Sequence, residues 1–97
     1  MLHHLVLFQM ADSSTEADRQ AIIEGLNALP ASIPQIHSFA CGSALPSATA
    51  SWSIGLAATF ANADDKRTYS AHPVHQKLIS EVIRPVVANT TSVQFES

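Results

Sequence analysis

The sequence predicts an α+β fold, in which an antiparallel sheet of four strands carries its helices on one face. Two observations predict it. Apolar or alternating segments typical of strands occur near both ends and in the middle of the chain, and stretches with helical spacing separate them. The chain has 97 residues, which is enough for one modest core and not for two. We therefore expect a single domain over residues 1–97.

The first strand is expected over residues 2–10, which are apolar at nearly every position and end at turn and cap residues. Such a run is typical of a strand that is covered on both faces. Side chains alternate along a strand, so this one has two distinct faces. One face holds His3, Leu5 and Leu7, and the other holds His4, Val6 and Phe8.

A helix is expected next, because residues 13–16 offer an N-cap followed by an acidic first turn. The residues after the cap place four apolar side chains on one side at helical spacing. They are Ile22, Ile23, Leu26 and Leu29. Pro30 and Pro34 mark the end of this helix.

Two further strands follow. The first is expected over residues 36–42, where His37 and Ser38 loosen the alternation. Residues 43–51 are small and polar with one proline, which indicates an exposed connection. Residues 52–60 then alternate with a clear period of two. Their apolar face holds Trp52, Ile54, Leu56, Ala58 and Phe60.

The last third of the chain predicts a pair of helices and a closing strand. Residues 62–65 cap a short helix through Ala71, which ends at His72 because the next residue is a proline. A second helix begins at Pro73, a favourable first position, and residues 91–95 alternate as a strand. The apolar face of the helix that begins at Pro73 holds Leu78, Ile79, Val82, Ile83 and Val86. The resulting βαββαβ order is the ferredoxin-like pattern, with both helices on one face of the sheet.

This arrangement leaves one face of the sheet bare, although the first strand is apolar on both faces. Charged residues make up 13% of the chain, about half the share of an average protein, so little polar surface is available to cover the apolar residues. We expect a second copy of the chain to cover the bare face, which predicts a homodimer of two sheets.

Composition excludes several function classes. Five basic and eight acidic residues, with no run of Lys or Arg, give no surface for nucleic acid. The apolar stretches are too short to span a membrane, and the first residues do not resemble a signal peptide. The single cysteine, Cys41, excludes an internal disulfide and fits a reducing compartment, so we expect a cytoplasmic protein. Three glycines and no phosphate-binding loop indicate no nucleotide cofactor.

Histidine and tyrosine are the candidates for chemistry. His4 shares a face with Val6 and Phe8 by parity and lies in the core if that face meets the helices, in which case His3 faces the dimer partner. His75 lies on the apolar stripe of the last helix, and Tyr69 ends the helix before it. Together His4, Tyr69 and His75 could surround a pocket in which His75 acts as a general base and Tyr69 donates a hydrogen bond to a developing oxyanion. The alternative is structural: His75 hydrogen-bonds a backbone carbonyl at a helix start, and Tyr69 fills the core.

A metal site is not expected. His72 and His75 provide only two ligands, the proline between them breaks the helical register, and no third ligand lies nearby in the sequence. We therefore expect neither a metal nor a cofactor.

Several segments resemble a known family over essentially the whole chain. They are His4-Leu-Val-Leu-Phe8, Leu29-Pro followed by Ile33-Pro, the motif Tyr69-Ser-Ala-His72-Pro-Val-His75, and Val82-Ile-Arg-Pro85. On these residues the chain resembles the stress-responsive dimeric α+β barrel (Dabb) family. The resemblance implies a ferredoxin-like subunit and a dimer whose two sheets close into a barrel. Most members have no known biochemical role, and several plant members are tied to stress responses.

One branch of the family, the plant olivetolic acid cyclases, carries out an intramolecular aldol condensation on a linear polyketide thioester without a cofactor. The resemblance implies catalytic roles for Tyr69 and His75, and it matches His4 to a histidine of the first strand. The residues that shape the substrate pocket differ, because Ile54 stands for a pocket histidine and Ile23 and Leu26 stand for aromatic residues. The same substrate is therefore not expected.

Taken together, the sequence predicts a homodimer with a small apolar pocket that binds a small carbonyl compound and transforms it by cofactor-free acid-base chemistry of the aldol or cyclase type. The candidate catalytic residues are His75, Tyr69 and His4, and the candidate binding residues are Val6, Phe8, Ile23, Leu26, Ile54, His72 and Leu78. Two alternatives stay open. One is a non-enzymatic stress-response or structural dimer, and the other is a cofactor-free monooxygenase.

Overall fold

The computed structural model describes residues 1–46 and 51–97. Part of the connection predicted over residues 43–51 therefore lies outside the described residues. In chain order the elements are β1 (Leu2–Met10), α1 (Glu16–Asn27), α2 (Leu29–Ser32), β2 (Ile36–Ser43), β3 (Ile54–Phe60), α3 (Ala63–Ala71), α4 (Pro73–Leu78), a π-helical turn η1 (Ile79–Ile83) and β4 (Val87–Glu96).

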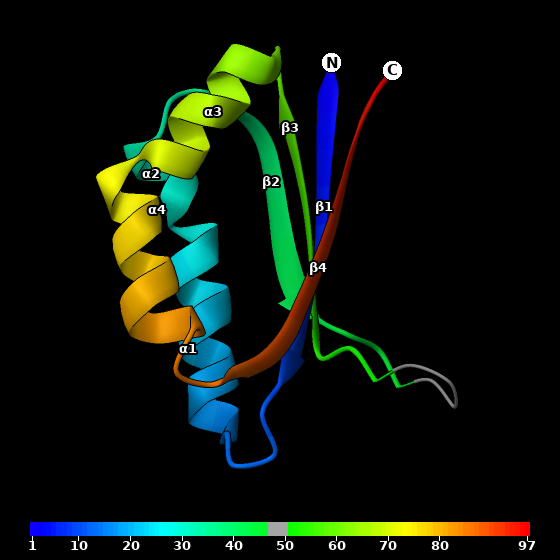
Figure 1. Cartoon of the computed structure of the whole chain (residues 1–97), viewed down its shortest axis with the longest axis vertical. Coiled ribbons are helices and arrows are strands. Elements are labelled where there is room, and N and C mark those ends of the chain that lie inside the picture. Colours follow the sequence, from blue (N-terminus) through cyan, green and yellow to red (C-terminus); the bar gives the residue numbers. More distant parts are fainter. Residues whose placement is uncertain (47–50) are drawn as a thin grey trace.

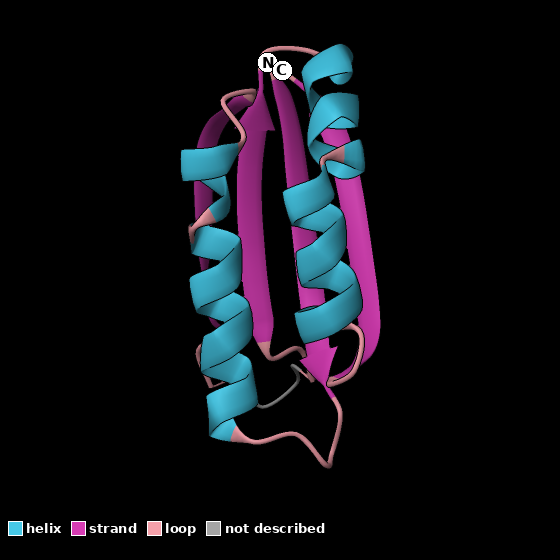
Figure 2. Ribbon diagram, turned by 90° about the vertical axis from the view of Figure 1, so that its left-hand side faces the viewer, coloured by secondary structure: helices cyan, strands magenta, loops and turns pink. Residues whose placement is uncertain are grey.

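The four strands form one sheet with the order β2-β3-β1-β4, and every neighbouring pair is antiparallel. All the helices lie on the same side of this sheet, as Figures 1 and 2 show. The predicted α+β, ferredoxin-like fold is confirmed. Strand β1 lies between β3 and β4, so the first strand in the sequence pairs with a strand from the middle of the chain and with the last strand.

Strand β1 has the two faces that its alternation predicts. The side chains of Leu2, His4, Val6, Phe8 and Met10 are buried beneath the helices. On the opposite face, Leu5 and Leu7 each keep 38% of their surface exposed. The same outer face carries two exposed residues of β4, Val93 and Phe95. The outer face of the sheet is thus apolar and uncovered within one chain.

Helix α1 begins with a capping box, in which the Thr15 hydroxyl accepts from the Asp18 backbone N–H and the Asp18 carboxylate accepts from the Thr15 backbone N–H. Its Ile22 and Leu26 side chains are buried against the sheet. Leu29 is buried too, but it belongs to the short α2, because α1 ends at Asn27.

The second helical segment of the chain is broken where the His-Pro step predicts. His72 ends α3 in an extended conformation and caps α4, because its Nδ1 accepts from the Val74 backbone N–H at 3.2 Å. After Leu78 the backbone widens into a π turn, closed by the Arg84 N–H and the Ile79 carbonyl at 2.8 Å. The sequence does not predict this turn.

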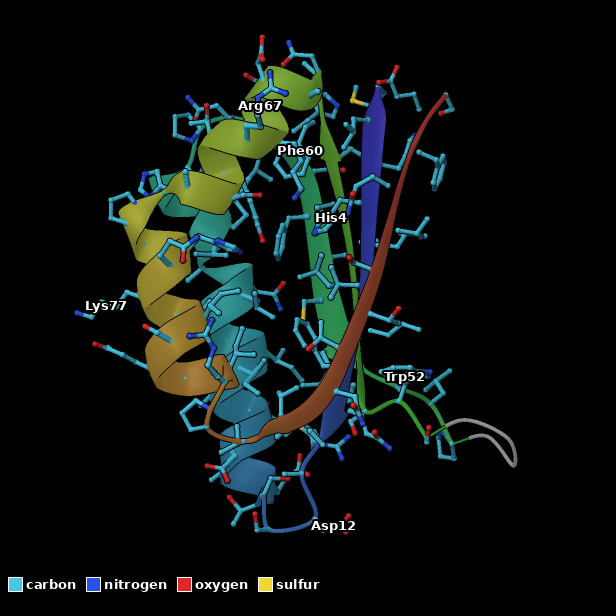
Figure 3. All side chains as sticks on the ribbon, in the orientation of Figure 1. His4, Asp12, Trp52, Phe60, Arg67 and Lys77 are labelled. Carbon is cyan, nitrogen blue, oxygen red and sulfur yellow. The ribbon has the colours of Figure 1, made fainter. Side chains whose placement is uncertain are left out.

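Two strand predictions need correction. Strand β3 begins at Ile54, so Trp52 lies outside it. Together with Leu5 and Leu7, Trp52 lines a hollow on the outer face. Figure 3 shows Trp52 on the side of the sheet away from the helices. The chain leaves the strand pattern at Ser53, whose backbone N–H donates to the Phe8 carbonyl and whose carbonyl accepts from Ala44. Strand β4 is also longer than predicted, at ten residues.

The loose alternation of the second strand has a structural cause. Pairing between β2 and β3 shifts register between Ile36 and Ser38, which is the place where the sequence alternation fails. No helix of the described residues is long and apolar enough to cross a membrane.

Candidate functional site

A cavity of about 170 Å³ lies between the sheet and the helices, and three ionisable side chains from β1, α3 and α4 line it. They are His4, Tyr69 and His75. The apolar walls are Val6, Phe8, Leu26, Leu56, Ile79 and Ile83, and β4 adds Thr90 and Ser92. The volume is below the roughly 300–1,000 Å³ of pockets for drug-sized molecules, so the cavity suits a small ligand.

His4 points from β1 toward the helices (Figure 3) and is 9% exposed. The Gln94 side-chain amide on the neighbouring β4 donates to its Nδ1 at 2.7 Å. The ring proton is therefore on Nε2, the nitrogen that is free to donate to a ligand. Burial, helped by electrostatic interactions with the nearby Lys66 and His75, lowers the pKa of His4 to about 4. The ring is neutral at pH 7.

His75 lies in the first turns of α4 with its ring centroid 4.3 Å from that of Tyr69. Its Nδ1 lies 3.2 Å from the Ser70 carbonyl. Because a carbonyl can only accept, Nδ1 carries the ring proton and Nε2 keeps its lone pair. Burial lowers the pKa of His75, and the charges of Lys66 and His72 lower it further, while the bond to Ser70 raises it. The result is a neutral ring with one basic nitrogen.

Tyr69 is the one buried residue of α3, with 2% of its surface exposed, and its ring packs against Phe60 with centroids 5.1 Å apart. Within residues 1–46 and 51–97 its hydroxyl makes no hydrogen bond, and no fully buried side-chain oxygen or nitrogen there lacks a partner. The hydroxyl therefore opens onto accessible space. Burial raises the pKa of Tyr69 to about 12, with a contribution from Cys41, so the hydroxyl keeps its proton.

These three residues form an acid-base set. His75 offers a lone pair, and Tyr69 and His4 offer protons for hydrogen bonding, in a cavity whose other walls are mostly apolar. Such a set can remove a proton next to a carbonyl and stabilise the oxyanion that results.

The structure brings together six of the ten candidate residues. His4, Val6, Phe8, Leu26, Tyr69 and His75 line the cavity. The other four do not line it. Ile54 is fully buried beneath the helices, Ile23 is half-buried at the edge of the core, and His72 caps α4. Leu78 faces α1, where its side chain lies against Gly25.

Sequence reasoning missed the residues that β4 contributes. Thr90 and Ser92 line the cavity because they pair with Phe8 and Val6 of β1, and this register is not readable from the sequence of β4 alone. Leu56 and Ile79 were detectable, since both lie on the apolar faces that periodicity predicts. Lys66, whose charge acts on both histidines, gave no signal beyond its place in a charged helical turn.

The described part of the chain contains neither a cluster of metal ligands nor a reactive thiol. Residues 1–46 and 51–97 contain no group of three or more His, Cys, Asp or Glu that could hold a metal ion. Burial raises the pKa of the Cys41 thiol to about 11, which keeps it protonated and unreactive.

The strand order, the single helical layer and the cavity between the two layers define an α+β protein of the ferredoxin-like type. The family described as the Stress responsive A/B Barrel Domain, Dabb, matches residues 2–97. The chain belongs to this family, whose domain is an α+β barrel. No curated protein sequence matches the chain.

Solved structures agree with this assignment. A dimeric ferredoxin-like protein of unknown function from Thermobifida fusca is 30% identical, with a TM-score of 0.89 over 99% of this chain and 90% of that chain. A dimeric protein of unknown function from Bacteroides fragilis is 26% identical, with a TM-score of 0.86 over 99% and 95%. Hydroxynitrile lyase from Passiflora edulis, at 14% identity and a TM-score of 0.84 over 97% and 90%, shares the fold.

Proposed function

We propose that the protein is a cytoplasmic homodimer that binds a small carbonyl compound in the cavity and transforms it by acid-base catalysis without a cofactor. One observation carries the proposal: the basic Nε2 of His75 belongs to a ring 4.3 Å from that of Tyr69, whose hydroxyl has no partner among the described residues.

The reaction follows from the groups present. His75 Nε2 removes a proton from the carbon next to the carbonyl, and the C–H electron pair moves into an enolate whose oxygen accepts from Tyr69. In the aldol version the enolate carbon attacks a second carbonyl of the same molecule and forms a C–C bond. The new alkoxide then takes the proton from the His75 imidazolium, which restores the neutral base. Neutral His4 donates its Nε2–H to a carbonyl oxygen.

Several observations support the dimer. Leu5, Leu7, Val93 and Phe95 form an exposed apolar face on the sheet, opposite the helices. Trp52 and Leu5 line a hollow of about 620 Å³ on the same face. Contiguous apolar surface of this kind marks an interface. The Thermobifida fusca and Bacteroides fragilis proteins, which share this fold, are dimeric.

The second candidate is a non-enzymatic dimer, and one contact favours it. The hydrogen bond from His75 to the Ser70 carbonyl satisfies a backbone group at the junction of α3 and α4. In this version the histidine only stabilises the fold. The two candidates predict different effects for the loss of His75 Nε2. The enzyme would lose turnover, whereas the non-enzymatic dimer would change only in stability.

Turnover of β-keto thioesters resembling short linear polyketides tests the proposal. His75→Ala is expected to abolish turnover and Tyr69→Phe to lower it by about 100-fold, as typical of a lost base and a lost oxyanion donor. His37→Ala is the matched control, because His37 is exposed on β2, away from the cavity.

Absence of turnover with every such substrate, or turnover that survives His75→Ala, would contradict the enzymatic proposal. If His75→Gln changes only the stability of the fold, the structural dimer is the better account. Oxygen consumption with a phenolic or quinol substrate would instead favour a cofactor-free monooxygenase.

A further inference from the structure

Lys66 lies on the same face of α3 as Tyr69, next to the cavity that Tyr69 lines, although Lys66 is not itself one of the lining residues. It precedes Tyr69 by three residues and Ser70 by four, and residues at these spacings share one face of a helix. Tyr69 is the buried residue of α3, so this face is the one that meets the sheet. Lys66 is half-buried, whereas its neighbour Arg67 is exposed.

A single residue connects the Lys66 ammonium to the candidate base. The Lys66 Nζ donates to the Ser70 hydroxyl at 2.8 Å, and the Ser70 carbonyl accepts from His75 Nδ1 at 3.2 Å. An ammonium has three donors, and Ser70 uses one of them. The other two remain available, and the flexible four-carbon stem lets Nζ exchange Ser70 for a ligand.

No carboxylate balances this charge in the described part of the chain. The ion pairs among residues 1–46 and 51–97 are Arg19 with Glu16 and Arg67 with Asp64. The eleven residues that line the cavity include no Asp or Glu. A half-buried cation without a counter-charge is costly, and an anionic ligand would offset that cost.

The charge of Lys66 acts on histidines on both sides of the cavity. It lowers the pKa of His4 on β1 and the pKa of His75 on α4, after burial of each ring. Burial also lowers the pKa of Lys66 itself. The cavity thus combines two neutral histidines, one protonated tyrosine and one nearby cation, without a negative group.

We propose that the Lys66 ammonium binds an anionic group of the substrate, so that the carbonyl compound taken by this cavity is a small keto acid in its carboxylate form. The inference rests on the proposed function, because it assigns the class of substrate to the same site. Lys66 is then a specificity-determining residue, while His75 and Tyr69 act on the carbonyl. The carboxylate would replace Ser70 as the partner of Nζ.

Levulinate and its methyl ester form a matched pair of probes, because both are small ketones and only the acid carries a charge. Binding is measured by NMR titration, with the ring signals of Tyr69 and His75 as reporters. We expect the wild-type protein to bind levulinate at least about tenfold more tightly than the ester. Lys66→Met should reduce this preference to about twofold or less, and Lys66→Arg should keep it.

Lys77→Met is the matched control, since Lys77 is exposed on α4 and points away from the sheet (Figure 3). It should leave the preference unchanged. Equal binding of acid and ester, or a preference that survives Lys66→Met, would overturn the role of Lys66 and leave the proposed function standing. If neither probe moves the signals of Tyr69 and His75 up to its solubility limit, both proposals fail.

Discussion

His75 can be structural and catalytic at the same time, because its two ring nitrogens have different tasks. The Ser70 carbonyl occupies Nδ1 and so determines which nitrogen carries the proton. Nε2 is left as the acceptor beside Tyr69. A hydrogen bond that looks like ordinary satisfaction of the backbone is therefore also what prepares the ring to act as a base.

The pKa of His4 links the stability of the fold to pH. Its pKa is about 4 in the folded chain against 6.5 for an ordinary histidine, so above pH 6.5 the ring is neutral in both states. Below pH 6.5 the unfolded chain takes up the proton first, and the free energy of unfolding falls until about pH 4. The loss is at most about 1.4 kcal/mol per pH unit for one group.

We expect His4→Gln to flatten the fall in the free energy of unfolding between pH 6.5 and pH 4, measured by urea titration at several pH values. The same change at the exposed His37 should leave the slope as it is in the wild type. A slope that His4→Gln does not change would show that His4 takes up its proton as easily in the folded chain as in the unfolded one.

At the scale of elements, the junction of α3 and α4 holds the two candidate groups together. Tyr69 is in the last turn of α3 and His75 in the first turns of α4, and His72 lies between them. The His72 ring accepts from the Val74 backbone N–H and so caps α4. Its role in the motif is therefore to fix the break between two helices, not to line the cavity.

His72→Ala should lower the free energy of unfolding by about 1 kcal/mol through loss of this cap, and His72→Ser should recover most of it. Chemical denaturation of the three proteins measures the difference. A stability unchanged by His72→Ala would mean that the cap contributes nothing.

The sequence predicts an element well where its hydrophobic periodicity lies within one continuous segment. β1 has its predicted bounds and faces, and the His-Pro step divides the helices where expected. The predictions fail where the structure depends on pairing between distant segments. The bounds of β4 follow from its ladder with β1, and Trp52 departs from the predicted period because β3 begins only at Ile54.

The same distinction applies to the candidate site. His4 and His75 were predictable from strand parity and helical spacing, and Tyr69 from its place at the end of the helix before His75. Thr90 and Ser92 were not, since their place in the cavity depends on the register of β4 against β1. Lys66 was missed because a lysine in a charged helical turn is ordinarily solvated, and only the tertiary structure half-buries it.

At the scale of the whole molecule, we expect the apolar outer face to be the surface through which two chains associate. We expect a mass of twice the 10.4 kDa of one chain in solution, measured by light scattering. Leu5→Glu places a charge at the centre of this face and should shift the protein to monomer or to aggregate.

Val74→Glu is the matched control for the dimer. Val74 is 42% exposed, close to the 38% of Leu5, but it lies on α4 in the opposite layer. It should leave the mass unchanged. A monomeric wild type would contradict the dimer, and a dimer that tolerates Leu5→Glu and not Val74→Glu would place the interface elsewhere.

The position of β1 also has a consequence for how the chain is made. β1 leaves the ribosome before the other strands, yet its partners are β3 from the middle of the chain and β4, which is synthesised last. Pairs such as Leu2 with Glu96 join residues far apart in the sequence, so the sheet cannot close until β4 has been synthesised. During that time a strand that is apolar on both faces is unprotected, and the nascent chain is most prone to aggregate before its last strand appears.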